Sequence, residues 1–218
     1  MKLIKILATL SAAALVLPAH AGLTVYTDQA AFQAAAGTTT VETFSAAPLG
    51  ASTNAFSGTF NGFSLTSQSN GNYSGIVNTT YNGDGGMPSS FAGQNFYGLG
   101  SSAGDAGPTS SFTFASGTRA FGFDFFNTDS TDRYSITVNG ITQVAIDYFS
   151  SGFFGIVATG GDTFSSASIQ SDDFGGYVST VGLDNILVDV TSVPEPTGLA
   201  LLGIALFGFA AARRTSRN

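Results

Sequence analysis

Phenylalanines that recur at every second position constrain the fold of this chain more than any other feature. Phe121, Phe123 and Phe125 alternate with other residues, and Phe112 and Phe114 do the same shortly before them. Residues two apart share one face of a β-strand, whereas a helical face needs a spacing of three or four. These segments are therefore predicted to be strands with one aromatic face in a core.

Similar patterns and turn signals recur about every eight to twelve residues along the body, which is typical of an antiparallel sandwich. Tyr134, Ile136 and Val138 lead into Asn139-Gly140, a dipeptide typical of type I′ hairpin turns. The returning strand is expected to carry Val144, Ile146 and Tyr148, and the remaining strands are expected near 39–44, 55–60, 62–67, 153–159, 163–170 and 181–190.

One short helix is expected near the start of the body. Thr27-Asp28 offers an N-cap, the helix runs from Gln29 to Ala36 with Phe32 as its apolar anchor, and Gly37 ends it. The predicted fold class is therefore all-β: one antiparallel sandwich over residues 22–192 with a single short N-terminal helix.

The N-terminus has the pattern of a secretory signal peptide. Lys2 and Lys5 give a positive start, residues 6–17 form an apolar run, and Ala19-His20-Ala21 makes an A-x-A cleavage site. The run is too short to span a membrane comfortably. Residues 1–21 are expected to form a signal-peptide helix that is removed after Ala21.

The C-terminus has the pattern of a membrane anchor. Residues 197–212 carry no charge, and Arg213, Arg214 and Arg217 follow them. Sixteen helical residues reach about 24 Å, short of a hydrocarbon core of roughly 30 Å, and snorkelling arginines can extend the span. A transmembrane helix over about 197–212 is predicted, with the arginines inside and the body outside.

Pro194-Glu195-Pro196 stands immediately before this apolar segment. Together with the arginine cluster it resembles the PEP-CTERM sorting signal of Gram-negative bacteria, over residues 193–218. Such a segment is also known as an ice-binding-protein C-terminal domain, a name that says nothing about ice binding by the body. The resemblance implies export by the secretion machinery, temporary anchoring in the inner membrane, and recognition by an exosortase near these prolines. Two prolines also keep that backbone extended and free of helix.

Several short motifs of the body resemble the jelly-roll sandwiches found in exosortase-dependent proteins. In such sandwiches the first and last strands often meet, and an acidic residue from each can hold calcium. The resemblance therefore implies Glu42 and Asp184 as candidate calcium ligands, with backbone carbonyls completing the six to eight oxygens that calcium takes. The motifs lie at 26–32, 42–44, 121–125, 134–140, 152–156 and 182–186.

Composition excludes much catalytic chemistry after signal removal. His20, Lys2 and Lys5 lie in the removed segment, so residues 22–218 have no His, Lys, Cys or Trp. This excludes Ser-His-Asp triads, Cys-His dyads, Schiff-base lysines, His-ligated zinc and disulfides. No catalytic residues are assigned, and the protein is not expected to be an enzyme.

The body is strongly acidic. Between residues 22 and 192 only Arg119 and Arg133 oppose thirteen carboxylates, a formal charge of −11. Such a surface repels nucleic acid, which is excluded as a partner, and it leaves divalent cations as a candidate cofactor. Asp129 and Asp132 form a second oxygen-rich loop, for which an ordinary Asx turn is the alternative.

Three functions remain open. The leading one is a non-enzymatic cell-surface or extracellular-matrix protein processed near Pro194-Glu195-Pro196. The second is a calcium-dependent carbohydrate-binding module, with extracellular polysaccharide as partner. The third is a secreted glycan hydrolase, which needs a carboxylate pair about 5 to 10 Å apart. Candidate sugar-stacking residues are Tyr73, Tyr81, Tyr97 and Tyr177.

Overall fold

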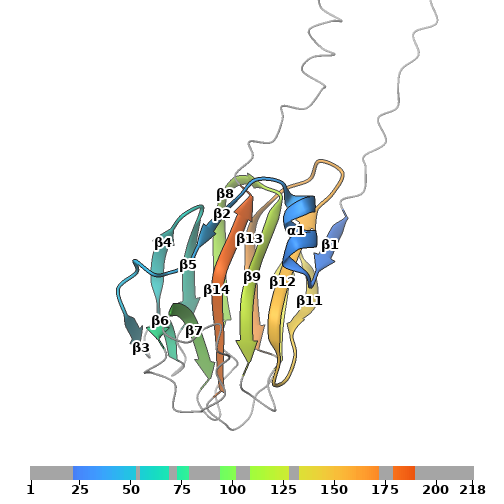
Figure 1. Cartoon of the computed structure of the whole chain (residues 1–218). Coiled ribbons are helices and arrows are strands. Elements are labelled where there is room, and N and C mark those ends of the chain that lie inside the picture. Colours follow the sequence, from blue (N-terminus) through green and yellow to red (C-terminus); the bar gives the residue numbers. More distant parts are fainter. Residues whose placement is uncertain are drawn as a thin grey trace, which may run out of the picture.

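The computed structural model describes residues 22–52, 55–68, 73–78, 94–101, 109–127, 133–171 and 179–189. Within these ranges two β-sheets pack face to face, and one helix covers part of the outer face of the larger sheet (Figure 1). Every strand pair in them is antiparallel. The predicted antiparallel sandwich with one short N-terminal helix is confirmed.

The larger sheet has eight strands, and its long last strand lies near its middle. The order is β1-β12-β9-β14-β7-β6-β3, and β2 also pairs with β14. The bounds are β1 (Leu23–Tyr26), β2 (Thr39–Glu42), β3 (Gly50–Ser52), β6 (Tyr73–Asn78), β7 (Asn95–Ser101), β9 (Ala120–Asn127), β12 (Ser151–Ala158) and β14 (Ser179–Asp189).

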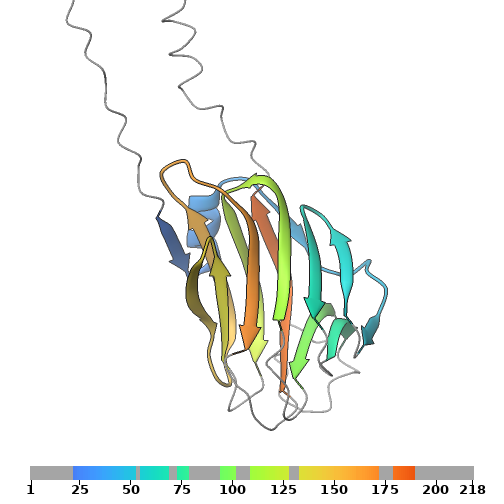
Figure 2. The same ribbon diagram turned by 180° about the vertical axis from the view of Figure 1, so that it is seen from behind.

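The smaller sheet has six strands in the order β11-β10-β13-β8-β5-β4 (Figure 2). Its outermost strands are β11 and β4. The bounds are β4 (Ser57–Phe60), β5 (Phe63–Gln68), β8 (Thr109–Thr118), β10 (Tyr134–Val138), β11 (Ile141–Ile146) and β13 (Phe164–Ser171).

The core between the sheets is aromatic, as the alternating phenylalanines predict. The ring centroids of Phe112 and Phe121 are 4.9 Å apart, and those of Phe114 and Phe121 are 5.0 Å apart, so β8 and β9 contact across the two sheets. Such pairs stabilise a core beyond the area they bury. The predicted core residues are all buried: Phe112, Phe114, Phe121, Phe123, Phe125, Ile136 and Val138.

The helix α1 (Gln29–Ala36) has the predicted bounds. The Asp28 side chain accepts a hydrogen bond from the backbone N–H of Ala31 at 2.7 Å and caps the helix. Phe32 is fully buried against Phe153 of β12, with ring centroids 5.2 Å apart. A Cβ at Gly155 would lie only 2.4 Å from the Phe32 ring, so the helix packs closely on the sheet because that residue is glycine.

The β10–β11 hairpin turns as predicted, but its returning strand differs. Asn139 and Gly140 both have positive φ, 50° and 76°, as a type I′ turn requires. The strand ends at Ile146, so Tyr148 lies beyond it, and Val144 is 56% exposed. β11 is the edge of its sheet, and its first four residues are exposed on both faces.

The two ends of the described chain lie at the same end of the sandwich. Leu23 of β1 pairs with Ala158 at the end of β12, and β14 runs in the same direction as β12 because both are antiparallel to β9. The start of β1 and the end of β14 are therefore near α1, and the turn at 147–150 is at the opposite end (Figure 1).

Both predicted terminal helices fall outside the described residues. The signal peptide at 1–21 and the anchor at 197–212 therefore stay predictions, as do the residue boundaries of the three segments. Among the described residues, no helix has the length and apolar character needed to cross a membrane.

Candidate functional site

A bulge in β14 brings two carboxylates together on the larger sheet. Along one edge, β14 pairs with β7 up to Leu183 and with β2 from Ile186 onward, and its register with β9 on the other edge shifts just after Asp184. Asn185, in the shift, has a positive φ of 48°. Asp184 lies directly opposite Asp124 of β9, and facing residues on paired strands project to the same side.

Asp184 is a buried carboxyl group in an unfavourable setting. It is 1% exposed, and its Oδ1 has no hydrogen-bond partner among the described residues. Burial raises its pKa from 3.8 to about 7. A backbone hydrogen bond from Asn185 opposes the shift, and the charges of Asp124 and Glu42 add to it. Near neutral pH the carboxyl group of Asp184 is therefore partly protonated and partly ionised.

The carboxylate of Asp124, unlike Oδ1 of Asp184, accepts a side-chain hydrogen bond. The Asn185 side-chain amide donates a hydrogen bond of 2.7 Å to its Oδ2. Burial raises the pKa of Asp124, and this hydrogen bond opposes the rise. Sequence reasoning missed Asp124, because its partner lies 60 residues away in the chain (184 − 124).

Glu42 lies close to this pair because β2 pairs with the last strand. The resemblance implies a meeting of the first and last strands, but the first strand, β1, pairs with β12 instead. It pairs in register with Ile186 of β14. Its carboxylate, however, holds the local backbone: Oε1 accepts from Phe44 N at 2.7 Å, and Oε2 accepts from Asn61 N at 3.4 Å. Asn61 follows β4 in the smaller sheet, so Glu42 also connects the two sheets.

The described residues supply few ligands for calcium. No group of three or more acidic, histidine or cysteine side chains among them is arranged to hold a metal ion. The buried Oδ1 of Asp184 is the oxygen that best fits such an ion, whereas both oxygens of Glu42 already accept hydrogen bonds. Calcium at Glu42 and Asp184 stays a prediction, and Asp129 and Asp132 lie outside the described residues.

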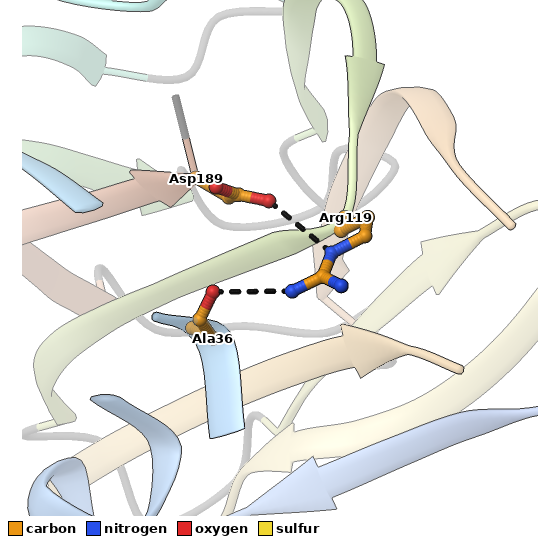
Figure 3. A network of polar contacts seen from close by, with 3 residues as sticks. All are labelled: Ala36, Arg119 and Asp189. Carbon is orange, nitrogen blue, oxygen red and sulfur yellow. Dashed lines mark hydrogen bonds and ion pairs between the residues drawn. The ribbon is translucent and has the colours of Figure 1, made fainter. Parts of the chain in front are cut away.

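A second polar cluster fastens the end of β14 to the helix (Figure 3). Arg119, between β8 and β9, places its Nε 3.4 Å from Oδ2 of Asp189, whose side chain is fully buried. The Nη2 of the same guanidinium donates to the carbonyl oxygen of Ala36, in the last turn of α1, at 3.2 Å. We call these three residues, Arg119, Asp189 and Ala36, the clasp.

Tyr97 does not stack on sugar, and its assignment as an exposed aromatic is wrong. It is fully buried, and its hydroxyl lies 2.6 Å from Oγ of Ser110, in a polar cluster that also holds Ser67 and Ser74. Burial raises the pKa of Tyr97 to about 12. The side chain of Tyr73, and Tyr81 and Tyr177 entirely, lie outside the described residues.

Among the described residues, the exposed aromatic side chains lie instead in the turn between β11 and β12. Phe149 is 71% exposed and Tyr148 is 41% exposed. Neither was singled out from the sequence as a surface residue, because their neighbours continue an alternating apolar pattern. Both residues leave the sheet because β11 ends at Ile146, and the local sequence does not indicate where this strand ends.

Comparison with known proteins gives one sequence match and several distant structural ones. The model of the PEP-CTERM protein-sorting motif matches residues 192–214. No curated protein matches the chain. A variant of the family 29 carbohydrate-binding module CBM29-2 is 14% identical, with a TM-score of 0.40 over 72% of this chain and 99% of that one.

Two other solved structures are similarly distant. A further family 29 carbohydrate-binding module is 16% identical, with a TM-score of 0.38 over 72% of this chain and 94% of that one. The module CtCBM11 is 13% identical, with a TM-score of 0.35 over 71% and 96%. At these scores the likeness carries no argument about a ligand of this chain.

Proposed function

We propose that this chain is a non-enzymatic cell-surface or extracellular-matrix protein. It is exported, anchored as a precursor in the inner membrane by its C-terminus, and processed by an exosortase at Pro194-Glu195-Pro196. The observation that carries the proposal is the PEP-CTERM sorting motif at residues 192–214. The secretion machinery and the exosortase are its partners during sorting, and its final location is the cell surface or the exterior.

The end of the sandwich supports this assignment. Asp189 is buried in the clasp, and the motif begins three residues later (192 − 189). Three extended residues span about 10 Å. The described part of the sandwich thus ends shortly before the motif. The apolar segment begins eight residues after Asp189 (197 − 189), so the precursor would hold the α1 end of the sandwich within about 27 Å of the membrane.

The burial of the carboxylates favours a non-catalytic body. Asp124 and Asp184 face each other, as a hydrolase pair would, but Asp184 is 1% exposed. A polysaccharide bond cannot approach a carboxyl group that water hardly reaches. The pKa of Asp184 is raised because the group is buried, which also occurs in purely structural sites.

A calcium-dependent carbohydrate-binding module is the second candidate. It is favoured by one observation: the buried Oδ1 of Asp184, beside Asp124, has no hydrogen-bond partner in the part of the chain that the structure describes. A bound cation would compensate this oxygen and stabilise the ionised form of the pair.

The sorting proposal is tested by replacing Pro194, Glu195 and Pro196 together by alanine. The apolar segment and its arginines are untouched, so export and anchoring should persist while processing stops. Wild type and variant are produced in a host with its exosortase and in one lacking it. Membrane and released fractions are then compared by mass spectrometry of the C-terminus.

The expected result is accumulation of unprocessed precursor in membranes for the triple variant, matching wild type in the host without exosortase. Val190→Ala with Thr191→Ala, just outside the motif, is the matched control and should be processed normally. Release of the triple variant with the wild-type C-terminus would show that Pro-Glu-Pro is only a linker and would refute the proposal.

A further inference from the structure

The turn at 147–150 presents the most exposed large apolar side chain among the described residues. Phe149 is 71% exposed, and the adjacent Tyr148 is 41% exposed. Nearly all the other phenylalanines in the described ranges pack in the core or against it. Two neighbouring exposed aromatic side chains make this turn a candidate binding surface.

The turn is held rigidly under these rings. Asn127 donates from its side-chain amide to the carbonyl of Asp147 at 3.1 Å, and from its backbone N–H to the carbonyl of Ser150 at 2.7 Å. The Ser150 hydroxyl donates to the same Asp147 carbonyl at 2.5 Å, and Asp147 Oδ1 accepts from Tyr148 N at 2.9 Å. A surface fixed before binding loses little entropy when a ligand arrives.

Phe149 adopts a backbone conformation that does not suit its side chain. Its φ is +42°, in the left-handed region that favours glycine and asparagine. A bulky residue there costs of the order of a kilocalorie per mole or more, and such strain is concentrated at binding sites. Asn or Gly at this position would make the folded state more stable, so the phenylalanine is better explained by a role in binding.

Tyr148 is oriented by one of the two cations of the body. The guanidinium carbon of Arg133 lies 5.2 Å from the centroid of its ring. The cation covers one face of the ring and fixes its direction. Tyr148 and Phe149 are thus two adjacent exposed rings on a hydrogen-bonded turn, and we call them the aromatic platform.

The aromatic platform lies at the opposite end of the sandwich from the end of β14. Ser151, just after it, pairs with Phe126, which pairs with Gly182 near the start of β14. The clasp is at the other end of β14, about 20 to 25 Å away over seven strand residues. If the chain is anchored as proposed above, this turn lies at the end of the sandwich opposite the end of β14, from which the anchor segment continues.

We propose that the aromatic platform binds neutral polysaccharide by stacking the Phe149 and Tyr148 rings on the C–H faces of pyranose rings. This proposal rests on the proposed function in one respect, because C-terminal anchoring would present the platform on the outer side of the cell. Two whole aromatic side chains would offer about 300 to 500 Å², and rings that are 71% and 41% exposed offer clearly less. Such an area suits one or two sugar rings and is far below that of a stable protein interface. The −11 charge of the body disfavours anionic glycans. Single-site binding is weak, and many copies on one surface make it effective.

Affinity gel electrophoresis of the full-length chain in mild detergent tests the proposal. The gels contain hydroxyethylcellulose, dextran or galactomannan as neutral probes and alginate as the anionic probe. Wild type should be retarded by at least one neutral probe, and Phe149→Asn should raise the dissociation constant at least tenfold. Leu49→Ser removes an apolar side chain that is 55% exposed elsewhere and should bind like wild type.

Stability separates loss of the platform from loss of the fold. Asn suits the positive φ at 149, so Phe149→Asn should melt at or above the wild-type temperature while it loses binding. Retardation by alginate alone, by none of the probes, or equally in wild type and Phe149→Asn would overturn the proposal. So would a wild-type dimer that Phe149→Asn converts to a monomer, because the platform would then be a contact between copies.

The outcome is independent of sorting. Detergent-purified chain carries the platform whether or not an exosortase processes it, so failure of the gel assay leaves the sorting proposal intact. Conversely, normal release of the triple-alanine variant would refute exosortase processing at Pro-Glu-Pro without changing retardation of the purified chain.

Discussion

Replacing Asp184 by Asn should make the protein more stable at high pH and leave it nearly unchanged at low pH. Asn has the shape of a protonated Asp but does not ionise. The folded protein binds the proton of Asp184 more tightly than the unfolded chain does, because burial raises the pKa from 3.8 to about 7. Wild type therefore loses stability as pH rises through this window, and the variant does not.

The expected size follows from the shift of about three pKa units. Each unit corresponds to about 1.4 kcal/mol, so the wild-type penalty grows from near zero at about pH 4 to roughly 4 kcal/mol above pH 7. For a body of this size a change of 1 kcal/mol moves the melting temperature by about 2 to 4 °C. The Asp184→Asn variant should then melt about 8 to 16 °C above wild type at pH 8.

Thermal melts followed by circular dichroism from pH 4 to pH 8 measure this difference. Asp162→Asn is the matched control, since it removes one negative charge from the turn between β12 and β13. It should change the melting temperature only slightly. Chemical denaturation at pH 5 and pH 8 then converts the melts into free energies of unfolding.

The pH dependence of the difference is the decisive quantity. A constant offset between wild type and Asp184→Asn would show that Asp184 titrates alike in the folded and unfolded chains. A gap that widens toward low pH would show that its folded pKa is lowered, as by a strong unseen partner. Either result would refute the argument from burial.

Other predictions concern the carboxylate pair, the polar cluster and the clasp. If calcium binds ionised Asp184, millimolar calcium should raise the wild-type melting temperature more at pH 8 than at pH 5 and should not affect Asp184→Asn; equal melts in calcium and chelator would remove the metal proposal. Tyr97→Phe should cost about 1 kcal/mol in chemical denaturation because Ser110 loses a buried partner, while Tyr26→Phe should cost less. Arg119→Met should cost about 2 to 3 kcal/mol, and adding Asp189→Asn should restore part of it; additive losses in this double-mutant cycle would show that the ion pair is not coupled.

Local patterns predict much of this fold. The period of two fixes the strand character of β8 and β9, and the cap at Asp28 with the glycine at Gly37 fixes both ends of α1. The turn at Asn139-Gly140 needs two residues with positive φ, and Asn and Gly are the residue types that adopt such values most readily. Each signal acts within a few residues, so it can be recognised without the partner strands.

The strands that the sequence does not reveal are those whose stability comes from their neighbours. β6 and β7 lie in a stretch rich in Gly, Asn and Ser and alternate weakly, yet they pair with each other, and β7 also pairs with the central β14. The short β1 is held by β12, far along the chain. Such pairings are set by tertiary packing, which overrides local preference.

The candidate site also combines features that the sequence predicts with features that depend on the pairing of distant strands. Asp184 and Glu42 follow from a resemblance, but the facing of Asp184 and Asp124 depends on register between two strands. Aromatic residues are equally ambiguous, because a ring suits a core as well as a surface. Tyr97 proves buried while Phe149 proves exposed, and only the folded turn at 147–150 decides between them.

The position of β14 sets how the body responds to mechanical load. If the body is tethered through its C-terminus as proposed above, the tether pulls along a strand bonded on one edge to β9 and on the other to β7 and β2. Force along that axis acts on many hydrogen bonds at once in shear, instead of opening them one by one as at an edge strand. Drag on the outer surface would therefore be carried by the middle of the larger sheet, with the clasp as the first contact to resist it.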